Sequence, residues 1–221
     1  MLSNQRIFMI VGSVALVMLS AIVHEVAHGW VAYRLGDPTA KQAGRLTLNP
    51  LAHLDPVGSV LLPLLMAWIG GPVFAFAKPV PYNPYNLRTP RRDEVLVALA
   101  GPASNLLQAL VGAVAFRLAF ASWSGAEDAL YWVLMALQIY VYVNLTLMFF
   151  NLIPLPPLDG SKIVMPLLHG GARQSYYKIQ QYGMPILLVV LYVLPSVLGF
   201  DPLGMYLDAT AGNLATLMMG A

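Results

Sequence analysis

Two histidines and a glutamate interrupt an apolar stretch near the start of this chain. The run 7–23 carries no charged residue and leads directly into the sequence HEVAH. Ionisable side chains are costly inside a bilayer, so their presence there indicates a function. On a helix, His24 and His28 lie one turn apart on one face, with Glu25 beside them. This is the H-E-x-x-H pattern, in which two imidazoles bind Zn²⁺ and the glutamate is a candidate general base.

The composition is that of an integral membrane protein. Of the 221 residues, 58% are hydrophobic and 10% are charged, and the mean hydropathy is +0.68. Soluble domains carry about a quarter charged residues. Cysteine is absent, which excludes disulfides and thiolate zinc sites, so a metal must take nitrogen and oxygen ligands. The formal net charge is +2, and the basic residues do not form a clustered face with interleaved aromatics, so we expect no nucleic acid partner.

The hydropathy pattern predicts an all-α polytopic membrane protein with about five to six transmembrane helices. We expect one membrane-embedded domain over residues 1–221. Its core helical segments are predicted at 6–35, 93–121 and 128–160, and further helices at 183–220.

The region 41–92, between the first two core segments, is broken by prolines and glycines. Within it, the alternation at 44–49 and the apolar run 73–77 predict two short β-strands near the cytoplasmic face. The stretch 57–77 is expected to be re-entrant, because non-helical backbone at membrane depth is tolerated against protein or water. An ordinary membrane span is the alternative for this stretch.

The distribution of basic residues predicts a topology. Ten of the twelve Lys and Arg residues lie in the segments 34–45, 78–92 and 162–178. If all three segments are cytoplasmic, the positive-inside rule is obeyed. The chain is then a multi-pass protein of the cell membrane (plasma or inner membrane), with HEVAH near the cytoplasmic side. The stretch 57–77 then begins and ends on that side, which favours re-entry.

A catalytic zinc needs a third protein ligand and one position left for water. In the predicted topology, the core segment that begins at residue 128 descends to the side on which HEVAH lies. It is followed there by a proline-rich stretch that carries Asp159. Prolines before Asp159 and Gly160 after it favour a locally fixed, non-helical backbone that could aim the carboxylate at the metal. The alternative is an ordinary turn aspartate, which Asp-Gly commonly is.

The chain resembles the site-2 proteases, intramembrane metalloproteases of peptidase family M50. Three motifs carry the resemblance in the family's order: HEVAH at 24–28, GPASN at 101–105 and NLIPLPPLDG at 151–160. The stretches 49–56 and 78–81 resemble a compact branch of that family. Many relatives carry an added PDZ or CBS domain, for which we expect no room in this chain.

The resemblance implies a set of site residues at the matching positions. It implies one Zn²⁺ per chain, a catalytic glutamate, and two asparagines near the metal. The implied ligands are His24, His28 and Asp159, the implied catalytic glutamate is Glu25, and the asparagines are Asn105 and Asn151.

Such a site predicts a mechanism and a substrate class. Zn²⁺ lowers the pKa of its bound water towards ~7, and Glu25 takes the proton of this water and returns it to the leaving amine. Asn105 and Asn151 are candidate stabilisers of the oxyanion, or else form interhelical hydrogen bonds. The implied partners are the lipid bilayer and a transmembrane protein substrate, whose helix must unwind and could pair with the predicted strands. No oligomeric state is predicted.

Some alternatives stay open at this level. His53 could shield the metal, bind substrate or make a loop hydrogen bond, and we favour a structural or gating role because two histidines and one carboxylate already fill the protein positions. A metal-dependent transporter would often show inverted repeats, which the sequence lacks by eye. A non-proteolytic zinc-binding scaffold would have no need of Glu25 as a base.

Overall fold

The computed structural model describes residues 4–55, 61 and 78–220, and within these ranges its regular elements are helical. They are α1 (Asn4–Arg34), α2 (Thr39–Gln42), η1 (Pro50–Ala52), η3 (Pro84–Asn86), α4 (Pro90–Phe120), α5 (Ala129–Asn151), α6 (Asp159–Val164), η4 (Met165–Leu167), α7 (Gly170–Gln180), α8 (Gly183–Leu188), η5 (Val189–Val193), α9 (Leu194–Leu198), α10 (Pro202–Leu207), η6 (Asp208–Gly212) and α11 (Asn213–Met219).

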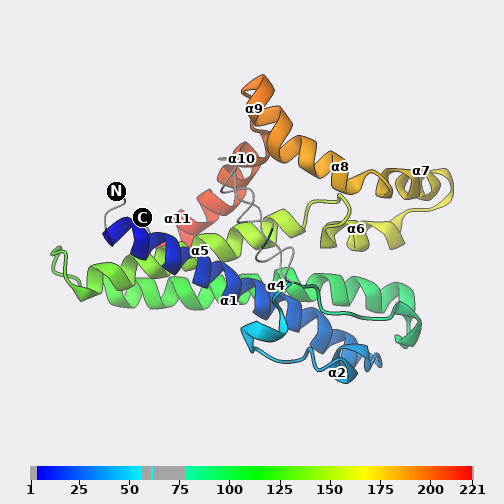
Figure 1. The fold of residues 1–221 in the computed structure, drawn as a ribbon, viewed down its shortest axis with the longest axis horizontal. Helices are drawn as coiled ribbons and strands as arrows, with labels where there is room; N and C mark the ends of the chain where they lie inside the picture. Colours follow the sequence, from blue (N-terminus) through cyan, green and yellow to red (C-terminus); the bar gives the residue numbers. More distant parts are fainter. Residues whose placement is uncertain (1–3, 56–60, 62–77, 221) are drawn as a thin grey trace.

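Three long helices form the centre of the molecule. Helix α4 packs against both α1 and α5, and it runs antiparallel to each of them (Figure 1). In the described part of the chain, these three helices are long and apolar enough to cross a membrane. A long helix lies at each of the three expected core segments, although α5 ends at Asn151 and does not continue to residue 160. Five to six spans stay a prediction: the described residues contain three, or four if a bent C-terminal pair is one span.

The starts of α4 and α5 follow from their capping residues. Helix α4 begins at Pro90, whose missing N–H costs nothing at a first helical position. The N–H of the preceding residue, Thr89, donates to the Asp93 carboxylate at 2.8 Å. Asp128 accepts hydrogen bonds from the N–H groups of Leu130 and Tyr131 at 2.9 and 3.1 Å. These contacts satisfy backbone donors that no preceding turn can pair.

The C-terminal third of the chain returns to the helical core. Helices α7 and α8–α9 are bent by 67° at their junction, and α10, η6 and α11 then run back toward α5 (Figure 1). Small residues of this last stretch, Ala211 and Ala215, are buried against α4 and α5 together with Val141 and Leu145. Small side chains let helices approach closely in an apolar environment, where packing replaces the hydrophobic driving force.

The strand expected at 44–49 is wrong: Gly44 lies in a turn, residues 46 and 47 form a bend, and the other three residues have no regular structure. Gly44 adopts a φ of +66°, which glycine tolerates without steric cost, and this reverses the chain after α2. Farther on, the Asn49 N–H donates to Thr47 Oγ1 and the Leu51 N–H donates to Asn49 Oδ1. Such local side-chain bonds compete with a strand ladder. The re-entrant stretch 57–77, apart from Leu61, and the strand expected at 73–77 lie outside the described residues.

The three basic segments gather at one end of the helical core. Segment 34–45 follows α1, segment 78–92 leads into α4, and segment 162–178 covers α6 and α7, all at the right in Figure 1. The loop 121–128, which joins α4 to α5, lies at the opposite end (Figure 1). The three basic segments therefore share one end of the helical core, and their cytoplasmic orientation stays a prediction.

A buried carboxylate holds the end of α1 to the start of α4. Asp37 is fully buried and accepts hydrogen bonds from the Thr39 N–H at 3.1 Å, the Asn83 N–H at 2.6 Å and Asn86 Nδ2 at 2.8 Å. Burial alone would raise the pKa of the Asp37 carboxyl, but these hydrogen bonds, with one from the Thr39 hydroxyl, hold it below its usual value. The segment before α4 is thereby tied to the end of α1.

We expect Asp37→Asn to destabilise the protein by about 2–4 kcal/mol at neutral pH, because hydrogen bonds to a charged acceptor are lost. The folded pKa lies below the unfolded one, so this stabilisation is present above the unfolded pKa and is lost as the pH falls through the folded value. Thermal unfolding in detergent from pH 7 to pH 3 measures it. The gap in Tm between the two proteins should shrink below about pH 4, and a gap independent of pH would contradict the assignment.

Candidate metal centre

Three buried side chains that can ligate a metal meet between α1, α4 and α6. His24 Nε2 and His28 Nε2 lie 3.0 Å apart, and Asp159 Oδ2 lies 3.2 Å from the first and 3.1 Å from the second. The exposed fractions of the three residues are 6%, 8% and 7%. Among the described residues, these three form the group of ligating side chains that could hold a metal ion. The structure therefore brings together the three ligands implied by the resemblance.

The hydrogen atom on the His28 ring is placed by a backbone carbonyl. His28 Nδ1 lies 2.6 Å from the Val97 oxygen on α4. A carbonyl oxygen can only accept, so Nδ1 must carry the hydrogen and donate. The neutral ring then directs the lone pair of Nε2 toward His24 and Asp159.

A chain of side-chain amides does the same for His24. His24 Nδ1 lies 2.5 Å from Asn105 Oδ1, and Asn105 Nδ2 donates to Asn144 Oδ1 at 2.9 Å. Asn144 Nδ2 in turn donates to the Tyr140 carbonyl at 2.9 Å. Because that carbonyl can only accept, it sets the orientation of both amides, and His24 Nδ1 must be the donor at the far end. Asn144 also contacts Ser20 on α1, to which its Nδ2 donates at 2.9 Å.

The resulting donor set fits a zinc ion. Two imidazole lone pairs and a carboxylate oxygen face one another, an arrangement that is repulsive unless a cation lies among them. A single proton can bridge one pair, whereas a divalent ion can bind all three. Tetrahedral zinc with bonds near 2.0 Å separates its ligand atoms by about 3.3 Å. The observed separations of 3.0–3.2 Å are close to this value.

Gly101, the first residue of the GPASN motif, makes room for this arrangement. A Cβ at Gly101 would overlap His28 Nε2 and both the Cε1 and Nε2 atoms of His24. Only a hydrogen atom fits between the α4 backbone and the two imidazoles. Pro102 follows and removes one helical N–H. The sequence alone did not show that Gly101 touches the ligands.

Asp159 reaches the histidines through a tight turn after α5. A Cβ at Gly160 would collide with the Leu152 and Ile153 carbonyl oxygens, so glycine allows α6 to begin directly beside the end of α5. Lys162 Nζ lies 3.9 Å from Asp159 Oδ1, the oxygen that points away from the imidazoles.

The other residues expected near the site have hydrogen-bond partners outside the three ligands, apart from Asn105. Glu25 Oε2 accepts a hydrogen bond at 2.8 Å from the Val80 N–H. Asn105 contacts the back of His24, as described above. Asn151 donates to the Leu147 carbonyl of its own helix at 2.9 Å. The His53 ring is buried and donates to the Thr47 carbonyl at 2.8 Å.

Asn144 and Ser20 were not singled out from the sequence. A signal for them existed, because each is a polar residue within an apolar span and both are fully buried. Their separation of 124 positions hides the pairing, which only the packing of α1 against α5 produces.

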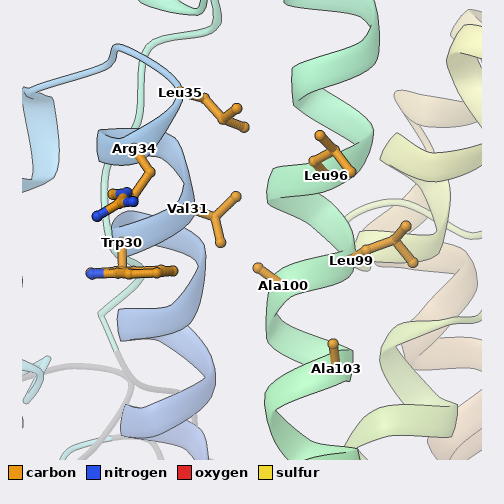
Figure 2. A pocket seen from close by; sticks show the side chains of 8 residues that line it. All are labelled: Trp30, Val31, Arg34, Leu35, Leu96, Leu99, Ala100 and Ala103. Carbon is orange, nitrogen blue, oxygen red and sulfur yellow. The ribbon is translucent and has the colours of Figure 1, made fainter.

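An apolar groove lies between α1 and α4, beside the helix face that carries the ligands. Val31 and Leu35 point from α1 toward α4, where Ala100 points back (Figure 2). The groove has a volume of about 320 Å³, and its lining is apolar apart from Arg34. It is lined by Trp30, Val31, Arg34, Leu35, Leu96, Leu99, Ala100 and Ala103.

These features define a membrane protein with a buried zinc site. Comparison with known proteins agrees: residues 120–194 match the family model described as Peptidase family M50. The "Putative zinc metalloprotease YwhC" of Bacillus subtilis is 40% identical over 185 residues, which cover 80% of this chain and 78% of that protein. The "Putative zinc metalloprotease Rip2" of Mycolicibacterium smegmatis is 32% identical over 180 residues, which cover 81% and 66%.

The chain belongs to peptidase family M50 and is a zinc metalloprotease of the membrane. "Stage IV sporulation protein FB" of Bacillus subtilis is a more distant relative, 27% identical over 140 residues that cover 62% of this chain and 44% of that protein. No solved structure gives a significant match. The transporter and scaffold alternatives find no support in these comparisons.

We expect Gly101→Ala to lower the affinity for zinc by more than about tenfold, since the new methyl group must displace both imidazoles. Zinc stoichiometry after dialysis against a chelator measures this. Gly12→Ala is the matched control, because a Cβ at Gly12 on α1 meets open space. Full zinc retention by Gly101→Ala would show that the ligands are arranged differently.

We expect Asn144→Ala to release the tautomer of His24 and to weaken zinc binding by about 10–100-fold. In zinc-free protein with ¹⁵N-labelled histidine, the His24 ring should change from one protonated Nδ1 to a mixture of tautomers. The chain contains four histidines, so the spectrum can be assigned by substitution. Asn213→Ala, which removes an exposed asparagine, is the control. An unchanged His24 signal would contradict the amide chain.

Proposed function

We propose that this metalloprotease is an intramembrane endopeptidase. It cleaves peptide bonds within or near the transmembrane segments of other membrane proteins. The observation that carries this proposal is the position of the ligand group. His24 and His28 lie inside the apolar helix α1, and they are covered by α4, itself long and apolar enough to cross a membrane. A substrate must therefore be brought to lipid depth.

In the proposed mechanism, His24, His28 and Asp159 would hold Zn²⁺, which would supply a Lewis acid for the scissile carbonyl and for a water molecule. Glu25, next to His24 on the same helix, takes the proton of the attacking water and delivers it to the leaving amine. Its Oε2 is oriented by the Val80 N–H, which leaves Oε1 for proton transfer.

We propose different roles for the two motif asparagines. Asn105 is a positioning residue, because its Oδ1 accepts from the ligand His24 and its Nδ2 donates to Asn144. Ligand histidines commonly donate their second ring N–H to such a partner, which fixes the ring orientation. Asn151, with its Nδ2 bonded to the Leu147 carbonyl at the end of α5, keeps the amide oxygen for a substrate peptide.

We propose that the protein is a multi-pass protein of the cell membrane with its active site near the cytoplasmic side. The three basic segments at one end of the helical core support this orientation. His28 lies less than two turns before Arg34, where α1 ends among these segments. A substrate helix would therefore be cut near its cytoplasmic end.

We expect Glu25→Gln to keep zinc and fold but to lower proteolysis by about 10²–10⁴-fold, because a general base is lost. Membrane proteins that accumulate uncut in cells expressing only this variant provide the substrates. Each is then incubated with wild-type and variant protein in liposomes. Glu127→Gln, the same change in the exposed loop before α5, is the control. Undiminished cleavage by Glu25→Gln would overturn the mechanism.

A further inference from the structure

The short segment 78–83 lies against the proposed base and is held along its length. The Val80 N–H donates to Glu25 Oε2 at 2.8 Å, and the Asn83 N–H donates to the buried Asp37 at 2.6 Å. The Lys78 N–H donates to the His53 carbonyl at 2.9 Å. The segment is therefore fixed on both sides of the residue that contacts Glu25.

Arg45 and His53 hold the first part of this segment, and we call the pair the Arg45–His53 clasp. Arg45 Nη2 donates to the Lys78 carbonyl at 2.6 Å and lies 3.4 Å from the Pro79 carbonyl. The same nitrogen lies 3.5 Å from His53 Nδ1, whose ring is fixed at Nε2 by the Thr47 carbonyl. His53 thus contributes a backbone acceptor for Lys78 and a ring beside Arg45.

The clasp is buried, with exposed fractions of 6% for Arg45 and 1% for His53. A guanidinium removed from water is costly unless its N–H groups are hydrogen-bonded. Nη2 of Arg45 makes all the contacts given above, while its Nε has no hydrogen-bond partner among the described residues. In the described part of the chain, the acceptors of Nη2 are the carbonyls of 78–79 and the His53 ring. The buried charge is therefore directed at the backbone that precedes Val80.

The side chain of Val80 also packs on α1. It lies over Gly29, one turn beyond Glu25, where an added Cβ would come within 2.6 Å of Val80 Cγ1. Val80 itself is 6% exposed. If the clasp is lost and Lys78 moves, Val80 moves with it. Val80 packs on α1, the helix that carries Glu25.

We infer that Arg45 and His53 are positioning residues for Glu25, acting through the backbone of residues 78–80. The clasp holds the Val80 N–H in place, and this N–H orients the carboxylate toward its substrate water. The inference rests on the proposed function only in that Glu25 is the base. It also assigns segment 78–80 a fixed structural role, because the N–H groups of Lys78 and Val80 and the carbonyls of Lys78 and Pro79 are bonded within the chain.

The test is amide hydrogen exchange in the full-length protein in lipid. Prolines at 79 and 81 carry no N–H, so the exchangeable amides of residues 78–81 are those of Lys78 and Val80. Both are followed in fragments that begin upstream of Lys78, and Val80 alone in a fragment that begins at Lys78. In Arg45→Met, we expect exchange of both amides to accelerate by about tenfold or more while zinc content is unchanged. Arg45→Lys, which keeps a donor, should recover part of the protection. Arg91→Met, an exposed arginine at the start of α4, is the matched control.

Activity provides the second readout, on a substrate identified with Glu25→Gln. Arg45→Met should lower kcat by about tenfold with KM within twofold of wild type, because a misoriented base affects the transition state and not substrate binding. His53→Gln should act in the same direction with a smaller effect. Arg91→Met should leave both constants unchanged.

The outcomes separate this inference from the proposed function. Unchanged Val80 exchange, or unchanged kcat, in folded Arg45→Met would overturn the clasp while leaving Glu25 as the base. Continued cleavage by Glu25→Gln would overturn the base, and exchange would still decide whether the clasp holds Val80. If Arg45→Met does not fold, the comparison of Arg45→Lys with wild type decides. In addition, Glu25→Ala should accelerate exchange at Val80 but not at Lys78. Equal protection of Val80 in Glu25→Ala and in wild type would contradict the hydrogen bond between the Val80 N–H and Glu25.

Discussion

The site depends on the hydrogen bonds that fix the Nδ1 side of two buried imidazoles. The Nδ1 hydrogen of His28 goes to a backbone carbonyl, and that of His24 goes to the Asn105 amide. Each ring is left with a bare Nε2, and both face the Asp159 carboxylate at 3.1–3.2 Å. The protein thus gathers three acceptors at low dielectric, where an uncompensated arrangement is costly. A bound cation would offset this cost.

Close helix approach is what makes this gathering possible. Gly101 allows the α4 backbone to touch both imidazoles, and Gly160 allows α6 to begin against the last carbonyls of α5. Small residues generally bring membrane helices together, and here they also set ligand separations. The amide of Asn144 adds a second constraint, since it joins α5 to Ser20 of α1 and to Asn105 of α4. Packing and metal geometry are therefore coupled through the same few contacts.

The sequence predicted the three long helices and the pair of histidines on one helix face, because both rest on strong patterns. An apolar run has a length that matches a bilayer, and H-E-x-x-H has a spacing that matches one helical turn. The ligand role of Asp159 was implied by the resemblance to family M50. The strand expected at 44–49 failed for a local reason. Its alternation is genuine, but Thr47 and Asn49 satisfy nearby N–H groups with their own side chains. An alternation of apolar and polar residues indicates which side chains are buried, but it carries no information about such local hydrogen bonds.

By itself, the sequence determined the chemistry of the donors: nitrogen and oxygen ligands without cysteine, a glutamate next to the first histidine, and a carboxylate after a proline-rich turn. The tertiary structure alone decided which nitrogen of each ring carries the hydrogen, and which backbone N–H orients Glu25. These choices depend on partners 55 to 81 positions away along the chain. Hydrogen bonds over such separations follow from helix packing, which periodicity and local propensity do not specify.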